Sequence, residues 1–234
     1  MFASQQRLVG QSGKVLAMLR FVEEILLLML RDDGKFNNIP QPAIDRAVAG
    51  AVLMELAMEN RIDTDLEQLM VVDSTPVGDS MLDTTLAQIV STEDKNARHW
   101  VEEISRQASD IREEALNRLV ERGILERQDD RFLWVFRSRR YPVIDGESER
   151  EVKLRIMGVL FSNEIPSPRD VVIICLAHSC GIFREMLSKR ELDQATDRIE
   201  QVRKLDLIGQ AMNQSIHDVE VWLANVAVQG RGFF

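Results

Sequence analysis

The chain has 234 residues, of which 45% are hydrophobic and 29% charged, with 29 Lys and Arg against 38 Asp and Glu and a net charge of −9. This balance excludes a disordered or collagen-like chain and disfavours a protein that coats nucleic acid. The longest apolar run, Ile25 to Leu30, is far shorter than a bilayer span. Two cysteines give no disulfide framework, and the polar opening residues do not resemble a secretory signal, so we expect a cytoplasmic protein.

Helical spacing of apolar residues dominates the chain. We expect residues 1–13 to form a mobile tail and residues 14–234 to form a single domain. A short strand is expected at 69–72, and a helix is expected behind Asp79. The other predicted helices are Lys14–Leu30, Ile44–Met58, Trp100–Arg106, Ile111–Arg122, Val171–Phe183, Leu187–Leu207 and His217–Val228.

Three helix boundaries carry specific signals. Asp79 is placed to cap a helix, and Gly123 is placed to end one. Ser167-Pro168-Arg169-Asp170 combines a capping serine, a proline at the first helical position and an acid in the first turn.

The segment from Leu125 to Val143 departs from the helical pattern. It is expected to form a β-hairpin of two extended runs separated by residues 128–130. The second run is apolar on both faces, with Phe132, Trp134 and Phe136 on one and Leu133 and Val135 on the other. Such a strand must be covered by core, by a partner or by lipid. The predicted fold class is therefore all-α, mostly helical, with one protruding β-hairpin.

No residues assemble a convincing catalytic or metal site. Cys175 and His178 are neighbours on a helix, but Cys180 points elsewhere and the remaining histidines lie in distant segments. A buried, hydrogen-bonded histidine is the simpler interpretation. Phosphate-binding loops, nucleophile elbows and zinc-protease motifs are missing from the sequence. We predict a protein that is not an enzyme and that uses no cofactor and no metal.

The hairpin mixes aromatic and basic residues, which suits an anionic membrane surface. The alternative is that the rings belong to the core or to an oligomer interface while the arginines are solvated. The residues concerned are Trp134, Phe136, Arg137, Arg139 and Arg140.

A winged-helix DNA reader also places a helix before a hairpin. Here that helix carries four acids against three bases, so we predict no nucleic-acid partner.

Several motifs in order resemble the Golgi phosphoprotein 3 family, from about Leu16 to Val228. Each motif is weak alone, but their order and spacing make a strong joint signal. They are the helix Phe21–Leu30, the Gly-x-x-Leu-x-Glu-Leu-Ala core within Ala49–Ala57, the turn Asp73–Asp83, Trp100-Val-Glu, Leu119–Leu125, Leu176-Ala-His178 and Ala195-Thr-Asp-Arg.

The resemblance implies a helical domain on the surface of Golgi membranes that binds phosphatidylinositol 4-phosphate, with a hairpin that takes part in oligomerisation. Eukaryotic members link glycosyltransferase tails to vesicle coats. The family's headgroup tryptophan falls on Pro40, one arginine on Ala49, and a basic pair on Ser109 and Arg112, so only Arg112 is retained. Arg46, one turn before Ala49, is positioned to replace the lost arginine.

We therefore predict a peripheral membrane protein that binds phosphoinositide-like anionic lipid through Arg112, Arg46 and the hairpin. Expected partners are that lipid, a homo-oligomer formed through the hairpin, and client protein tails. The alternative is an oligomerisation or protein-interaction module that has lost the lipid site. The short polar N-terminus, in place of a long basic one, suggests a bacterial or otherwise divergent member.

Overall fold

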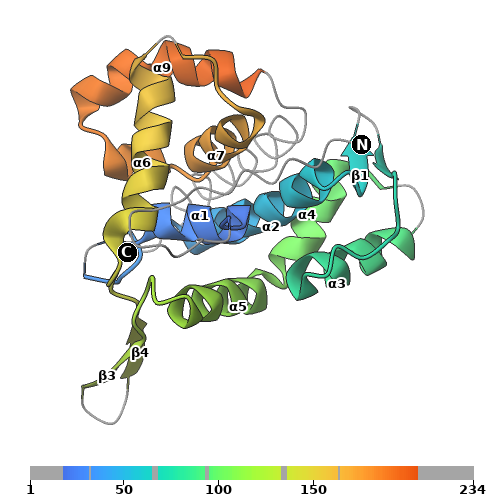
Figure 1. Ribbon diagram of the computed structural model, residues 1–234, viewed down its shortest axis with the longest axis horizontal. Coiled ribbons are helices and arrows are strands. Elements are labelled where there is room, and N and C mark those ends of the chain that lie inside the picture. Colours follow the sequence, from blue (N-terminus) through green and yellow to red (C-terminus); the bar gives the residue numbers. More distant parts are fainter. Residues whose placement is uncertain are drawn as a thin grey trace, which may run out of the picture.

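The computed structural model describes residues 18–31, 33–64, 68–92, 95–132, 136–162 and 164–204, with the backbone alone at 129–132 and 136–139. The described part is mostly helical and carries two small antiparallel ribbons (Figure 1). Its helices are α1 Phe21–Met29, α2 Gln41–Met58, α3 Ser80–Val90, α4 Ala97–Ser105, α5 Ala108–Glu121, α6 Gly146–Phe161, α7 Pro168–Ser179, α8 Ile182–Met186 and α9 Lys189–Arg203. The predicted fold class is confirmed.

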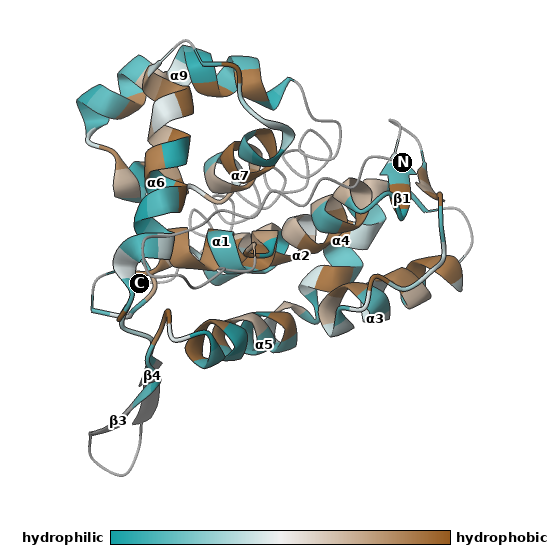
Figure 2. Cartoon of the chain, in the orientation of Figure 1, coloured by the Kyte–Doolittle hydropathy of each residue, from teal (hydrophilic) through white to brown (hydrophobic). Residues whose placement is uncertain are grey.

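Helix α1 lies at the centre, and all nine of its residues are buried. It packs against α2, α5, α6 and α7, while α2 also contacts α3 and α4. Alanine and glycine residues along the middle of α2 permit this close approach, and Ala47, Ala49 and Ala51 are completely buried. Hydrophobic colour is prominent in α1, α2 and α7 in Figure 2, whereas α9 is mostly hydrophilic.

The first ribbon pairs β1, Ile62–Thr64, with β2, Leu69–Val71. The predicted strand at 69–72 is therefore confirmed, although its partner was not anticipated. The second ribbon pairs β3, Gln128–Phe132, with β4, Phe136–Arg140, and Leu125 bridges Val143 at its base. It extends away from the helices (Figure 1).

The hairpin is confirmed, but its internal division was wrong. Residues 128–130 lie inside β3, so they do not separate the two runs. The ladder pairs Phe132 with Phe136 as its last described rung, one residue from each strand. The expectation of one strand containing both is therefore incorrect, because the chain reverses between them.

Local signals placed some helix ends correctly. The Asp79 side chain accepts a hydrogen bond from the Met81 amide and caps α3, and Ser167 and Asp170 form a capping box on α7. Gly123 follows α5 with a φ of +73°, in the left-handed region that favours glycine.

Other boundaries need correction. The first helix begins at Phe21 instead of Lys14, because Arg20 has extended backbone and its amide is capped by Glu23. The helix expected at 171–183 is two helices, α7 and α8, broken at Gly181 with a φ of +77°. Helix α6 was not predicted at all. The expected tail at 1–13 and helix at 217–228 lie outside the described residues.

Within the described residues, no helix is both long enough and apolar enough to cross a membrane.

Candidate functional site

A buried network of ion pairs surrounds the N-terminus of α1. The Glu55 carboxylate accepts a hydrogen bond from the Phe21 amide at 2.6 Å and pairs with Arg20 at 3.2 Å. Arg20 also reaches Glu59 at 2.8 Å and Asp79 at 3.2 Å. Burial raises the pKa of Glu55, against the opposing effect of these donors.

Asp79 joins this network to α5. Its two carboxylate oxygens accept hydrogen bonds from Arg118 at 2.8 and 3.1 Å, which is a bidentate pair. Burial opposes ionisation of Asp79, but Arg118 and Arg20 together lower the pKa of its carboxyl. Arg118 also donates to Ser80 and Glu114, and the hydrogen bond to Asp79 does most to raise its pKa.

The opposite side of α1 is anchored in the same way. Glu24 accepts from Arg155 at 2.8 Å and from Arg169 at 3.1 Å, and Arg155 also pairs with Asp170 at 2.7 Å. The Arg169 guanidinium lies 4.4 Å from the Phe21 ring centroid, a cation–π contact. These arginines are occupied by structural partners, so we do not assign the network a ligand.

Arg112 has a different environment. Its side chain is 22% exposed, and among the described residues it forms one ion pair, at 3.6 Å from Asp45 in α2. It lies 5.9 Å from the Phe36 ring centroid and donates no hydrogen bond to any described residue. A guanidinium carries five N–H donors in a planar fork, so this side chain retains capacity for a planar or tetrahedral anion.

Arg46 lies one residue from Asp45 but is more fully occupied. Its guanidinium donates to both oxygens of Glu102 in α4 at 3.2 Å and to the Pro42 carbonyl at 3.1 Å. Only 13% of its side chain is exposed. The structure thus pairs the two predicted arginines with different acids on different helices.

The loop between α1 and α2 carries Phe36, which lies beside Arg112, and it also contacts the base of the hairpin. The Gly34 carbonyl accepts a hydrogen bond from the Tyr141 amide at 2.8 Å, two residues before Phe36 in the same loop. Gly34 has a φ of +74°, and a Cβ there would lie 2.3 Å from the Pro142 nitrogen. Glycine is required because two backbones meet at this point.

The hairpin residues of the predicted site are described only in part. Trp134 lies outside the described residues, and for Phe136, Arg137 and Arg139 the structure gives the backbone of β4 alone. Arg140, the last residue of β4, is half-buried. Tyr141, which follows it, is 5% exposed and belongs to the core.

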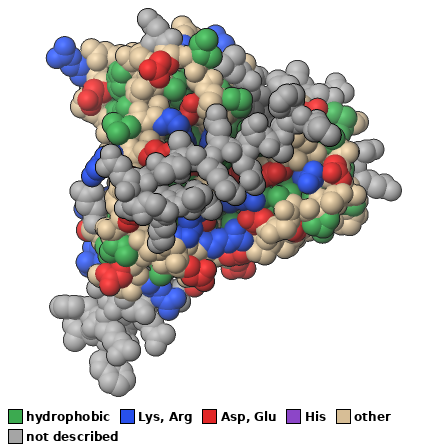
Figure 3. Space-filling model, in the orientation of Figure 1, with side chains coloured by type: hydrophobic (Ala, Val, Ile, Leu, Met, Phe, Trp, Pro, Cys, Tyr) green, Lys and Arg blue, Asp and Glu red, His purple; other side chains and the backbone are tan. Residues whose placement is uncertain are grey.

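One face of the molecule carries charges of both signs. On the face drawn in Figure 3, the described Lys and Arg side chains lie close to Asp and Glu side chains. Any anion site here must depend on the local geometry of a few donors, because the net charge is −9.

The His178 cluster has an environment suited to a structural role. The His178 ring is partly buried, with Nε2 3.0 Å from an Arg203 nitrogen, and burial followed by the Arg203 charge lowers its pKa to about 4. Burial raises the pKa of Cys180 to about 12, which makes the thiol unreactive at neutral pH. Among the described residues no cluster of three metal-ligating side chains occurs.

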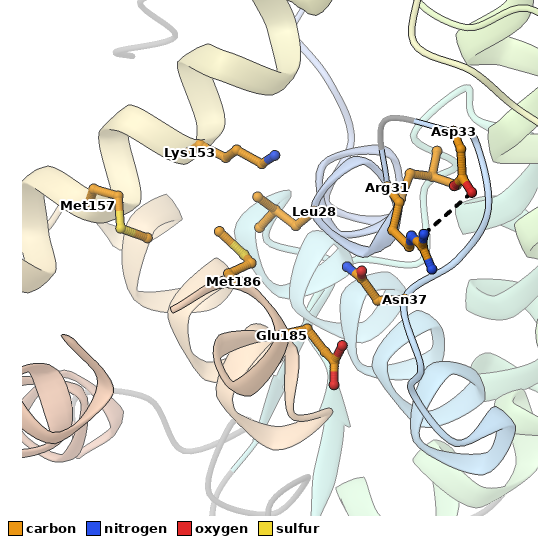
Figure 4. A pocket seen from close by; sticks show the side chains of 9 residues that line it. Leu28, Arg31, Asp33, Asn37, Lys153, Met157, Glu185 and Met186 are labelled. Atoms are coloured by element: carbon orange, nitrogen blue, oxygen red, sulfur yellow. Dashed lines mark ion pairs between the residues drawn. The ribbon is translucent and has the colours of Figure 1, made fainter. Parts of the chain in front are cut away.

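A pocket of about 580 Å³ lies between α1, α6 and α8 and the loop after α1 (Figure 4). Leu28, Met157 and Met186 form its apolar wall. Its charged groups are of both signs, and Arg31 pairs with Asp33 at 3.5 Å. Mixed charge of this kind selects no ligand class, and His178 is not among the lining residues.

Comparison with known proteins identifies the family to which the chain belongs. The family model described as Golgi phosphoprotein 3 (GPP34) matches residues 21–219. The chain belongs to the Golgi phosphoprotein 3 family. It is also similar to "Vacuolar protein sorting-associated protein 74" of Eremothecium gossypii, with 24% identity over 211 residues. That alignment covers 75% of this chain and 63% of the relative, so the chain spans less than two thirds of the relative's length.

The structure locates the positions at which this family member departs from the headgroup pattern. Pro40 is the exposed residue before α2, and Ser109 is exposed on α5 one turn before Arg112. Ala49 is completely buried, so this position of α2 faces the core. Sequence analysis missed Phe36 and Asp45, although both lie in or beside segments that it examined.

Proposed function

We propose that this protein associates peripherally with membranes, from the cytoplasmic side, by binding an anionic lipid headgroup that carries a phosphate monoester, as phosphatidylinositol 4-phosphate does. The binding surface combines Arg112, the loop containing Phe36, and the basic-aromatic hairpin. Membership of the Golgi phosphoprotein 3 family supports this proposal. The proposed role is binding alone, without catalysis.

The observation that carries the proposal is that Arg112 has hydrogen-bond donors that the described residues do not use. A phosphate group needs converging, charge-assisted hydrogen-bond donors, and Arg112 is partly buried yet donates none to the described protein. The Phe36 ring beside it supports one side of the guanidinium. The side chain is therefore ordered by packing while its donors remain available.

The hairpin supplies the second part of the surface. Its base is tied through Tyr141 to Gly34, in the loop that also carries Phe36. Basic residues of β4 follow one another closely at positions 137, 139 and 140. Each arginine near an anionic bilayer contributes about 1 kcal/mol, so three would add substantially to one headgroup contact.

Vesicle flotation tests the proposal. We expect the protein to float with phosphatidylcholine vesicles that contain phosphatidylinositol 4-phosphate and to remain unbound with phosphatidylcholine alone. Arg112→Gln should lose most of this binding. Arg106→Gln removes the same charge from an exposed arginine at the end of α4, where it pairs with Glu103, and should bind like the wild type. Absence of wild-type binding at low salt would contradict the proposal.

A second candidate function is oligomerisation through the hairpin, because this ribbon extends away from the helical body (Figure 1). Charge reversal at Arg139 and Arg140 separates the two functions. Under the lipid proposal the double variant loses flotation and keeps its mass by light scattering. Under the alternative there is no flotation to lose, and the test is whether the mass of the wild type exceeds that of one chain.

A further inference from the structure

We propose that the Asp45 carboxylate is a built-in competitor for the anion site on Arg112, and that a phosphate group enters by replacing it. This inference rests on the proposed function and adds a residue that sets the affinity of the site. It implies a preference for phosphate monoesters, which carry nearly two charges at neutral pH, over phosphodiesters, which carry one.

The contact between Asp45 and Arg112 has the geometry of a replaceable partner. Its 3.6 Å separation is longer than a hydrogen bond, and both side chains are partly exposed, at 26% and 22%. Long, partly exposed ion pairs of this kind contribute little to folding. The Arg118–Asp79 pair differs, since it has two short hydrogen bonds and an acid that is only 8% exposed.

Asp45 also retains a partner when Arg112 turns to another anion. Its Oδ1 accepts a hydrogen bond from the side-chain Nε2 of Gln41, one turn earlier in α2, at 2.6 Å. Releasing Arg112 therefore does not leave the carboxylate without a donor. Gln41 in addition holds the carboxylate close to the guanidinium, which makes the competition effective.

The competition favours ligands with more charge and more oxygens than a carboxylate. A phosphate monoester offers three terminal oxygens to the guanidinium fork, and its second charge compensates for the lost Asp45 contact. A phosphodiester or a carboxylate headgroup offers a single charge, and it gains little by replacing another single charge. Asp45 thus raises the intrinsic affinity that any anion needs to occupy this site, a threshold that a phosphate monoester passes more easily than phosphatidylserine.

Two kinds of probe, lipid vesicles and inorganic phosphate, test the inference on four chains. The chains are the wild type, Asp45→Asn, Asp45→Asn with Arg112→Gln, and Asp110→Asn as the matched control. Asp110 is exposed on α5, two residues from Arg112, and loses the same charge, but it hydrogen bonds to Ser109. The probes are phosphatidylcholine vesicles with either phosphatidylinositol 4-phosphate or phosphatidylserine, and inorganic phosphate followed by NMR of the arginine side-chain Nε–H signals.

We expect Asp45→Asn to bind phosphatidylinositol 4-phosphate vesicles about two- to five-fold more tightly than the wild type, in line with loss of an exposed pair. It should gain by a similar factor with phosphatidylserine, because a competitor that must leave before either headgroup binds lowers both affinities alike. Adding Arg112→Gln should remove both gains. The inorganic phosphate arm should show the same order of affinities at the Arg112 Nε–H signal.

The outcomes separate the two proposals. If Asp45→Asn binds both probes like the wild type, or if Asp110→Asn shows the same gain, the competitor role is wrong while membrane binding stands. If no chain floats but Asp45→Asn binds inorganic phosphate more tightly through Arg112, the competitor role stands and the membrane function fails. Thermal unfolding serves as the folding control, and Asp45→Asn should unfold close to the wild-type temperature.

Discussion

The arginines around the N-terminus of α1 and the arginine at position 112 differ in how completely the protein satisfies them. Arg118 donates to Asp79, Ser80 and Glu114, and its acids are held in turn by other donors. Among the residues that the structure describes, Arg112 has one long ion pair and a ring beside it. Charge on an arginine therefore does not by itself indicate a binding site, whereas unused donor capacity does.

The largest effect is expected from breaking the saturated network. Asp79→Ala removes the cap of α3 and leaves Arg118 and Arg20 without a shared partner. We expect the free energy of unfolding to fall by about 3–5 kcal/mol, as when one member of a buried pair is removed. Chemical denaturation measures this. Asp33→Ala, in the exposed pair with Arg31, should change stability by less than about 1 kcal/mol.

The next effect concerns the link between the loop and the hairpin. Gly34→Ala places a Cβ against Pro142 and forces a side chain onto a left-handed backbone. We expect a loss of about 2–3 kcal/mol, combining backbone strain with displacement of the hairpin base. Gly146→Ala is the matched control, because a Cβ there meets nothing within 4 Å. Equal stability of the two variants would show that the contact is not needed.

Arg203 differs from the other arginines in that one of its partners, the His178 ring, is uncharged at neutral pH. Arg203 lies 3.0 Å from His178 Nε2, which accepts a hydrogen bond only while the ring is uncharged. The folded pKa of about 4 lies below the ordinary 6.5, so the unfolded chain binds more protons between these values. Stability should therefore rise by about 2 kcal/mol from pH 4 to 6.5, the partial exposure of the ring reducing the full effect.

His178→Gln keeps an acceptor oxygen and removes the titration. The difference between its stability and that of the wild type should vary with pH between 4 and 6.5 and become constant above 6.5. Denaturation at several pH values measures it. A difference that does not change across this range would mean that the ring titrates normally in the folded protein.

The smallest effect on folding is expected at Arg112. Arg112→Gln breaks a partly exposed pair at 3.6 Å, so stability should change by less than about 1 kcal/mol. Arg118→Gln should cost several times more, because it removes the two hydrogen bonds of a bidentate pair from the buried Asp79, which then keeps only Arg20 and the Met81 backbone amide. Equal losses in thermal unfolding would remove the distinction between the two arginines.

Sequence analysis predicted features that depend on near neighbours. The caps at Asp79 and Ser167 and the glycine after α5 are local arrangements, and each was placed correctly. The apolar spacing of Val152, Ile156 and Val159 in α6 was also present in the sequence, but the surrounding charges obscured it. The helix break at Gly181 was missed because the apolar residues continue on both sides of it.

The site could be predicted only in part, because it depends on contacts between distant segments. The family resemblance singled out Arg112, but its partners Asp45 and Phe36 lie 67 and 76 residues earlier in the chain. Likewise, Arg46 was a reasonable replacement for a lost arginine, and only the fold reveals that its Nη2 donates to both carboxylate oxygens of Glu102. A single sequence contains no pattern that matches one arginine with one acid across such distances.

The most direct test of the central claim is the salt dependence of flotation for the wild type, Arg112→Gln and Arg118→Gln, with phosphatidylcholine vesicles that contain phosphatidylinositol 4-phosphate. Screening acts within about 10 Å at 0.1 M salt, so wild-type binding should weaken as salt rises. Folded Arg118→Gln should follow the wild-type curve, and Arg112→Gln should remain largely unbound even at low salt. Flotation of Arg112→Gln along the wild-type curve would contradict the account.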